Sequence, residues 1–298
     1  MLARTLLCAL VTATALASAS RATAQAVYRD SIPGQAYFAG TASLYRGDYR
    51  DAIRSLNSGA RGAIQTINAR WVDSVCFYAM LGETYYHAGR YQDALAQFDA
   101  ACSLLLQNRQ WLLRVQFEQL TPDPTVARRA APWGVTGRQV VPARFGNTMA
   151  VSQGQFDNSQ AVAQGGVVQQ LQFWQVNVVE IMRCSALAIR RRNEILGPLA
   201  KYDKLSGDMT RLYAGGGGAP PNHWSNAWTS LLRGIAQAGV GDTTQAARSL
   251  EAAVLAGGRF DHPLTGLALL EQGRLAMAGG EPLVAESLLA EASFSAFQ

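Results

Sequence analysis

The chain contains little charge, few histidines and no long hydrophobic run after its first residues. Of its 298 residues 49% are hydrophobic and only 16% are charged, a balance that argues against intrinsic disorder and against a highly charged coiled coil. Beyond the N-terminal segment no stretch of about 18 uninterrupted apolar residues occurs, so we expect no transmembrane segment in the mature chain.

Sequence motifs of enzymes are also lacking. The three histidines (His87, His223 and His262) do not occur in a zinc-binding spacing, and there is no P-loop, G-x-S-x-G elbow or dinucleotide fingerprint. The glycine run 215–218 has no Lys-Ser/Thr after it and is interpreted as a linker. We therefore predict a protein that is not an enzyme, with no cofactor and no metal site.

The first residues follow the order of a cleavable export signal. Arg4 precedes the apolar run 5–17, which is too short to span a bilayer, and Ala22-Thr23-Ala24 fits the A-x-A cleavage pattern, with Ala17-Ser18-Ala19 as the second choice. A buried N-terminal helix is the alternative. We predict a signal peptide over 1–24 and a secreted or periplasmic protein.

The mature chain would have a mild charge. Cleavage removes two of the 26 basic residues and none of the 21 acidic ones, which leaves a net charge of +3. Nucleic-acid binders usually carry a concentrated basic face, so we expect no nucleic-acid partner.

A six-residue pattern that starts with glycine and ends with alanine occurs four times. The copies are Gly47–Ala52, Gly89–Ala94, Gly241–Ala246 and Gly280–Ala285. A large apolar residue follows each alanine after four positions and a small one after seven, and these offsets share one face of a helix. The glycine ends the preceding helix because it adopts the left-handed conformation without strain. Each unit therefore predicts a helix, a tight turn and a second helix.

The second unit, residues 75 to about 106, resembles the tetratricopeptide repeat (TPR) family. The residues at the signature positions of that family are Tyr78, Leu81, Gly82, Tyr85, Gly89, Tyr91, Ala94, Phe98 and Ala101, whereas Leu106 replaces the usual closing proline. The resemblance covers about half of the mature chain and is closest to exported bacterial TPR proteins. It implies an all-α, TPR-type helical-hairpin solenoid, interrupted by an irregular insertion that has room for β-strands.

The spacing of the repeats sets the predicted domain boundaries. The anchor alanines are 42, 152 and 39 residues apart, against about 34 in the family, so the middle interval must contain more than a linker. We predict the following segments: N-terminal TPR-like repeats over 25–117, a Pro/Gly-rich insertion over 118–167, a long helix and a degenerate repeat over 168–214, a flexible linker over 215–222 and C-terminal TPR-like repeats over 223–298.

Short strands are predicted inside the insertion at Arg138–Val141 and Thr148–Ser152, as a hairpin that turns on Phe145-Gly146-Asn147. We favour an insertion that lies ordered across the solenoid, with a ligand-binding loop as the alternative. After it, one helix is predicted from about Val168 to Leu196 and a second from about Asp203 to Tyr213.

In the TPR family the first helices line a concave surface that binds partners. Transferred position by position, the resemblance places these residues on that surface: Tyr37, Thr41, Tyr45, Glu83, Tyr86, His87 and Arg274. Tyrosines with charges of both signs would suit an extended peptide, and the alternative is that neighbouring helices bury them. Arg190-Arg191-Arg192 would either meet an acidic partner or simply follow the helix dipole, and we favour the dipole.

Three cysteines remain after cleavage. If the second unit is a helical hairpin, Cys76 and Cys102 lie at the same end of it, so a disulfide is geometrically feasible, although two independent buried thiols are favoured. Cys184 is expected to be an unreactive core residue.

We predict from this pattern a non-catalytic scaffold that binds a peptide or partner protein in the concave groove, in envelope or surface-complex assembly. The alternative is the N-terminal regulatory or targeting region of a larger secreted enzyme, because the chain ends at Phe294-Ser295-Ala296-Phe297-Gln298 without the polar cap of a repeat array. Exposed phenylalanines there would also suit a homodimer formed through the C-terminal end. A third interpretation is that arginines of the insertion bind an anionic glycan.

Overall fold

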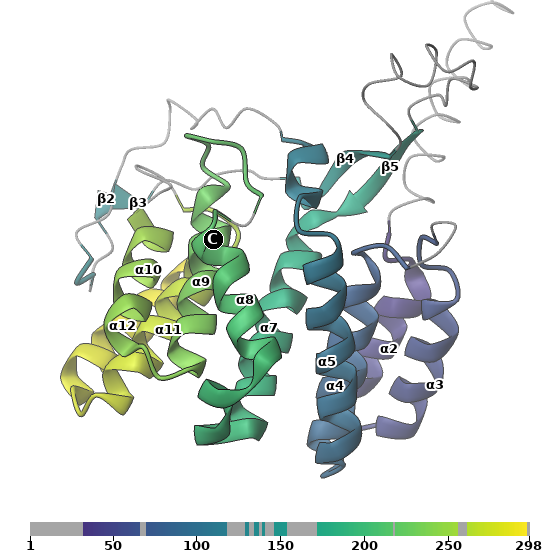
Figure 1. The fold of residues 1–298 in the computed structure, drawn as a ribbon, viewed down its shortest axis with the longest axis horizontal. Coiled ribbons are helices and arrows are strands. Elements are labelled where there is room, and N and C mark those ends of the chain that lie inside the picture. Colours follow the sequence, from purple (N-terminus) through teal and green to yellow (C-terminus); the bar gives the residue numbers. More distant parts are fainter. Residues whose placement is uncertain are drawn as a thin grey trace, which may run out of the picture.

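A computed structural model describes residues 32–65, 70–117, 129–130, 134–136, 139–140, 146–153, 172–216, 218–255 and 261–296. In these ranges the chain forms ten α-helices and five short strands (Figure 1). The predicted signal peptide and most of the predicted insertion lie outside them. None of the described helices is long and apolar enough to cross a membrane.

Four helical hairpins form where the glycine–alanine pattern occurs. They pair α2 (Gln35–Tyr45) with α3 (Tyr49–Ala60), α4 (Ser74–His87) with α5 (Tyr91–Gln107), α9 (Asn226–Gly239) with α10 (Thr243–Leu255), and α11 (Thr265–Ala278) with α12 (Pro282–Ala296). The turn glycine of each pattern has a φ between +73° and +86°, in the left-handed region that favours glycine. The prediction of helix, tight turn and helix is therefore confirmed at all four copies.

Each of these hairpins is closed by the same contact between a glycine and a large apolar side chain. The pairs are Gly40–Leu56, Gly82–Phe98, Gly234–Leu250 and Gly273–Leu289, and a Cβ on the glycine would lie between 2.5 and 2.9 Å from the partner side chain. The anchor alanines on the second helices are 0% exposed in all four hairpins. Small residues on both helices thus let the two axes approach closely.

A fifth, irregular hairpin lies in the centre of the array. It consists of α7 (Val178–Leu196), the 3-10 helix η2 (Gly197–Tyr202) and α8 (Lys204–Ala214). Helix α7 packs against α4 and α5 on one side and against α9 on the other, so it joins the two halves of the chain (Figure 1). The first helices α2, α4, α7, α9 and α11 follow one another through the molecule.

A small antiparallel sheet lies at the N-terminal end of the central helix α7, in the strand order β1 (Val115–Gln116), β4 (Thr148–Gln153) and β5 (Gln172–Asn177). The predicted fold class is thereby confirmed: helical hairpins with a β-containing insertion. The prediction of a helix from about residue 168 was wrong for 172–177, because β5 pairs with β4 along its whole length. The helix begins at Val178, where the side chain of Asn177 accepts a hydrogen bond of 2.9 Å from the backbone nitrogen of Glu180.

The predicted strands of the insertion exist, but their predicted hairpin does not. Strand β3 (Gln139–Val140) pairs with β2 (Arg129–Ala130), whereas β4 pairs with β1 and β5. Strands β3 and β4 therefore pair with other strands and not with each other across the predicted turn.

Part of the insertion contacts the last helix of the array. Val135 donates its backbone N–H to Glu291 of α12 over 3.0 Å, and the hydroxyl of Thr136 donates to the same carboxylate over 2.5 Å. These two residues therefore contact the last hairpin, and most of the remaining insertion lies outside the described residues. At the end of α12, Phe294 is half-buried, so it is not the exposed phenylalanine that the sequence analysis expected, and Phe297 lies outside the described residues.

The described cysteines are free and buried. The disulfide between Cys76 and Cys102 does not form, and the favoured prediction of separate buried thiols is confirmed. Cys184 is 0% exposed and lies in the core, where its sulfur is 3.3 Å from the hydroxyl oxygen of Tyr37.

Candidate binding groove

Two hollows lie on the face formed by the first helices. The apolar hollow, of about 640 Å³, lies between α7 and the last hairpin, and the polar hollow, of about 590 Å³, lies between α7 and the first two hairpins. Arg183, Leu187 and Arg190 of α7 line both hollows. These residues are spaced by four and three positions, so they form one stripe of the helix with a hollow on each side, and we call the two hollows and this stripe the groove.

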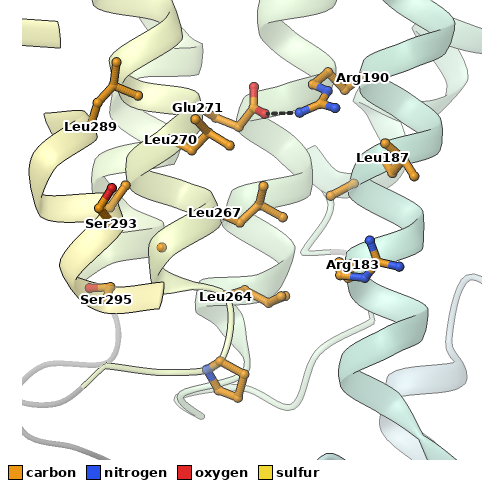
Figure 2. A pocket seen from close by; sticks show the side chains of 14 residues that line it. Arg183, Leu187, Arg190, Leu264, Leu267, Leu270, Glu271, Leu289, Ser293 and Ser295 are labelled. Carbon is orange, nitrogen blue, oxygen red and sulfur yellow. Dashed lines mark hydrogen bonds and ion pairs between the residues drawn. The ribbon is translucent and has the colours of Figure 1, made fainter. Parts of the chain in front are cut away.

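Five leucines line the apolar hollow. Figure 2 shows Leu267 and Leu270 of α11, and Leu264 just before that helix, on one side and α7 on the other. At one end the two helices are bridged by an ion pair of 3.3 Å between Arg190 and Glu271 (Figure 2). The hollow is therefore an apolar space with charged groups at its edge.

The polar hollow contains three of the residues that the sequence analysis selected: Tyr45, Glu83 and His87. The side chain of Tyr45 is 74% exposed, and His87 is also exposed. Glu83 is buried beneath them and lies 3.1 Å from the Nε2 atom of His87.

Tyr37 and Thr41 are not on the surface of the groove, contrary to the prediction. Tyr37 is 0% exposed, its hydroxyl donates to Glu180 of α7, and its ring packs edge-on against Phe77 at 5.3 Å. Thr41 is 8% exposed and donates its hydroxyl to the backbone of Phe38 within α2. Tyr37 is buried because α2 packs against α3 and α4 and because Glu180 of α7 reaches its hydroxyl, contacts that a position-by-position transfer from one repeat does not take into account.

The remaining predicted residues, Tyr86 and Arg274, line neither hollow and contact α7 instead. The guanidinium of Arg191 lies 4.3 Å from the ring centre of Tyr86, which is half-buried. Arg274 is exposed and forms an ion pair with Glu194 across the gap between α11 and α7.

The three consecutive arginines of α7 each bind a different part of the fold. Arg190 pairs with Glu271 of α11, and Arg191 donates two hydrogen bonds of 2.8 Å to Glu83 of α4. Arg192 is buried and contacts three groups: Asp99 of α5 at 2.6 Å, Asp203 at 2.8 Å and Ser206 of α8 at 2.6 Å. These arginines are structural cross-links between helices. The helix-dipole interpretation alone does not account for their contacts, and they are not a free site for an acidic partner.

In two ion pairs near the groove the acid lies deeper than the base, whereas in the pair of Arg190 with Glu194 the base lies deeper. The side chain of Arg183 is 35% exposed against 14% for Glu180, and that of Arg274 is 45% exposed against 10% for Glu271. Burial raises the pKa of Glu271 above its usual value despite the nearby arginines. Burial also acts on Glu83, but there the hydrogen bonds from Arg191 prevail and the pKa is lowered. The acids of the Arg183–Glu180 and Arg274–Glu271 pairs therefore meet solvent less than their guanidinium partners do.

Sequence reasoning missed the residues that border both hollows. Arg183, Leu187 and Arg190 show the offsets of a single helical stripe, which was a usable signal once the helix that carries them was predicted. The leucines of α11 gave no such signal, because a leucine on a helix is normally a core residue. Within the described ranges no group of three or more His, Cys, Asp or Glu side chains is arranged to hold a metal ion.

Comparison with models of known protein families and with curated protein sequences gives no match to this chain. The resemblance to the TPR family therefore rests on the residues quoted above and remains a prediction.

Proposed function

We propose that this protein is a non-catalytic scaffold, exported from the cell, that binds an extended segment of a partner protein in the groove formed by its first helices. One observation carries this proposal: a single stripe of α7 borders both hollows, so the two hollows are neighbours on the face of the first helices. Two neighbouring hollows suit an extended chain better than a compact small molecule.

The chemistry of the groove supports the same function. Its two halves combine apolar walls with exposed tyrosine, histidine and arginine side chains, which are the groups that peptide-binding surfaces use for stacking and hydrogen bonds. The floor of the groove is cross-linked by ion pairs from α7 to α4 and α11, so the binding surface is preorganised and loses little entropy on binding.

A random peptide library displayed on phage tests the proposal. We expect the mature protein to select peptides, and a Tyr45→Ala/His87→Ala double variant to bind those peptides at least tenfold more weakly. Both side chains are exposed, so the variant should fold normally. Tyr202→Ala is the matched control, because Tyr202 is 79% exposed and does not line either hollow. Failure to select any peptide, or equal binding by all three proteins, would contradict the proposal.

A further inference from the structure

We propose that the apolar hollow is the anchor subsite of the groove, and that it takes one large apolar side chain of an extended peptide whose neighbouring Asp or Glu binds Arg183. This inference rests on the proposed function, because it names the ligand chemistry of the same groove. It makes two separate claims, one on the apolar side chain and one on the carboxylate.

The claim on the apolar side chain follows from the walls of the hollow. Leu187, Leu267, Leu270 and Leu289 line it and are each only half-buried, so they keep apolar surface in contact with water. A side chain such as leucine, methionine or phenylalanine would remove that surface from water, which is favourable in proportion to the area covered. The volume of about 640 Å³ is ample for one such side chain.

The claim on the carboxylate follows from the hydrogen bonds of Arg183. Its Nε and Nη2 atoms donate to Glu180 over 2.8 and 2.6 Å, whereas Nη1 has no hydrogen-bond partner among the described residues. The side chain is 35% exposed and lines the apolar hollow, so this edge of the guanidinium is accessible to a ligand. The half-buried Glu180 fixes the orientation of the guanidinium, and a carboxylate next to the anchor would be the natural partner of its free edge.

The shape of the groove favours a peptide over a small amphiphile with the same two groups. An alkyl carboxylate could place its chain among the leucines and its head on Arg183, but it would leave the polar hollow empty. An extended peptide continues over the α7 stripe and reaches Tyr45 and His87 in the polar hollow. The occupant that covers both hollows is therefore a polypeptide segment.

The sequences and affinities of the peptides selected from the random library test this inference. We expect them to share a large apolar residue adjacent to Asp or Glu. Replacing that acid by its amide in a synthetic peptide should weaken binding to the unaltered protein about tenfold, and the loss should shrink as salt is added. Because this measurement changes only the peptide, it does not depend on whether a variant protein folds.

Protein variants then locate the subsite. Leu267→Gln should weaken binding of the same peptide about tenfold, while Leu199→Gln, at a leucine 67% exposed outside the groove, should bind as the unaltered protein does. In Arg183→Gln, replacing the peptide's acid by its amide should have no further effect, which is the signature of a direct contact.

The outcomes separate this inference from the proposed function. One outcome would overturn the anchor subsite and leave the groove function standing. In that outcome the selected peptides lack the apolar–acidic pair, bind the Tyr45→Ala/His87→Ala variant more weakly, and bind the Leu267→Gln variant as they bind the unaltered protein. Binding of dodecanoate in the hollow together with no selected peptide would overturn both, and would assign the hollow to an amphiphile instead.

Discussion

Asp73 lies at the start of α4 and should make the stability of the protein depend on pH in an unusual direction. The residue is 0% exposed; its Oδ2 atom accepts a hydrogen bond of 2.9 Å from the backbone of Ile64, and no described residue donates to Oδ1. Burial raises the pKa of this carboxyl to about 7, because it removes water from the charged form. The nearby backbone N–H groups and Arg70 stabilise the charged form and offset only part of this effect.

The sign follows from proton linkage. Below pH of about 4 the carboxyl is protonated in both the folded and the unfolded chain; above that value the unfolded chain loses the proton first, and folding becomes less favourable until pH reaches about 7. The difference of about three pH units corresponds to about 4 kcal/mol in the free energy of unfolding. Asp73→Asn remains neutral throughout and removes this dependence.

Urea unfolding of the two proteins, followed by circular dichroism, measures the effect. Between about pH 5 and about pH 8 the variant should gain about 2.5 kcal/mol relative to the unaltered protein. Other titrating groups cancel in this comparison because both proteins contain them. Asp51→Asn, at an exposed position of α3, is the matched control and should give a difference close to zero at every pH. A constant difference between the Asp73 variant and the unaltered protein would refute the reasoning.

Three further predictions concern the packing of the array. Gly82→Ala should lower the free energy of unfolding by about 1–2 kcal/mol, because the new Cβ would lie 2.5 Å from the ring of Phe98. Gly207→Ala in α8 should raise the free energy of unfolding by up to about 1 kcal/mol, because its Cβ meets only a flexible side chain at 3.6 Å. Equal effects of the two substitutions in urea unfolding would contradict the close-packing argument. Arg192→Ala should cost about 3 kcal/mol, since it leaves Asp99 unpaired and a gap between three elements, and thermal unfolding should detect it as a loss of several degrees. Addition of a reductant should leave the melting temperature unchanged, because the described cysteines are free; a lower value would reveal a disulfide.

Local sequence was sufficient to predict the four regular hairpins. The left-handed glycines at the turns, such as Gly47 and Gly89, and the buried alanines that follow them, such as Ala52 and Ala94, occur where the repeated pattern places them. These features depend on residues close together in the chain, since a turn and one helical stripe are determined within about one hairpin.

The strand β5 illustrates where local reasoning fails. The apolar residues from Phe173 onward keep helical offsets, and they continue without interruption into α7, so periodicity alone predicts one long helix. The first of them form a strand because β4, about 20 residues earlier in the chain, offers an edge to pair with. Pairing with a distant segment overrode the local pattern.

The sequence by itself determined the hairpins, their turns and the small residues that let helices approach, because each of these is a short-range property of the chain. Only the tertiary structure decided which polar residues border the groove and which lie inside. Tyr37 and Tyr45 occupy the same helix eight positions apart, yet α7 buries the first and leaves the second exposed. Likewise, Arg190, Arg191 and Arg192 are indistinguishable as letters, and they acquire separate roles because a different helix lies opposite each of them. The partner of each of these charged side chains lies on another part of the fold, so it is known only once the helices are packed.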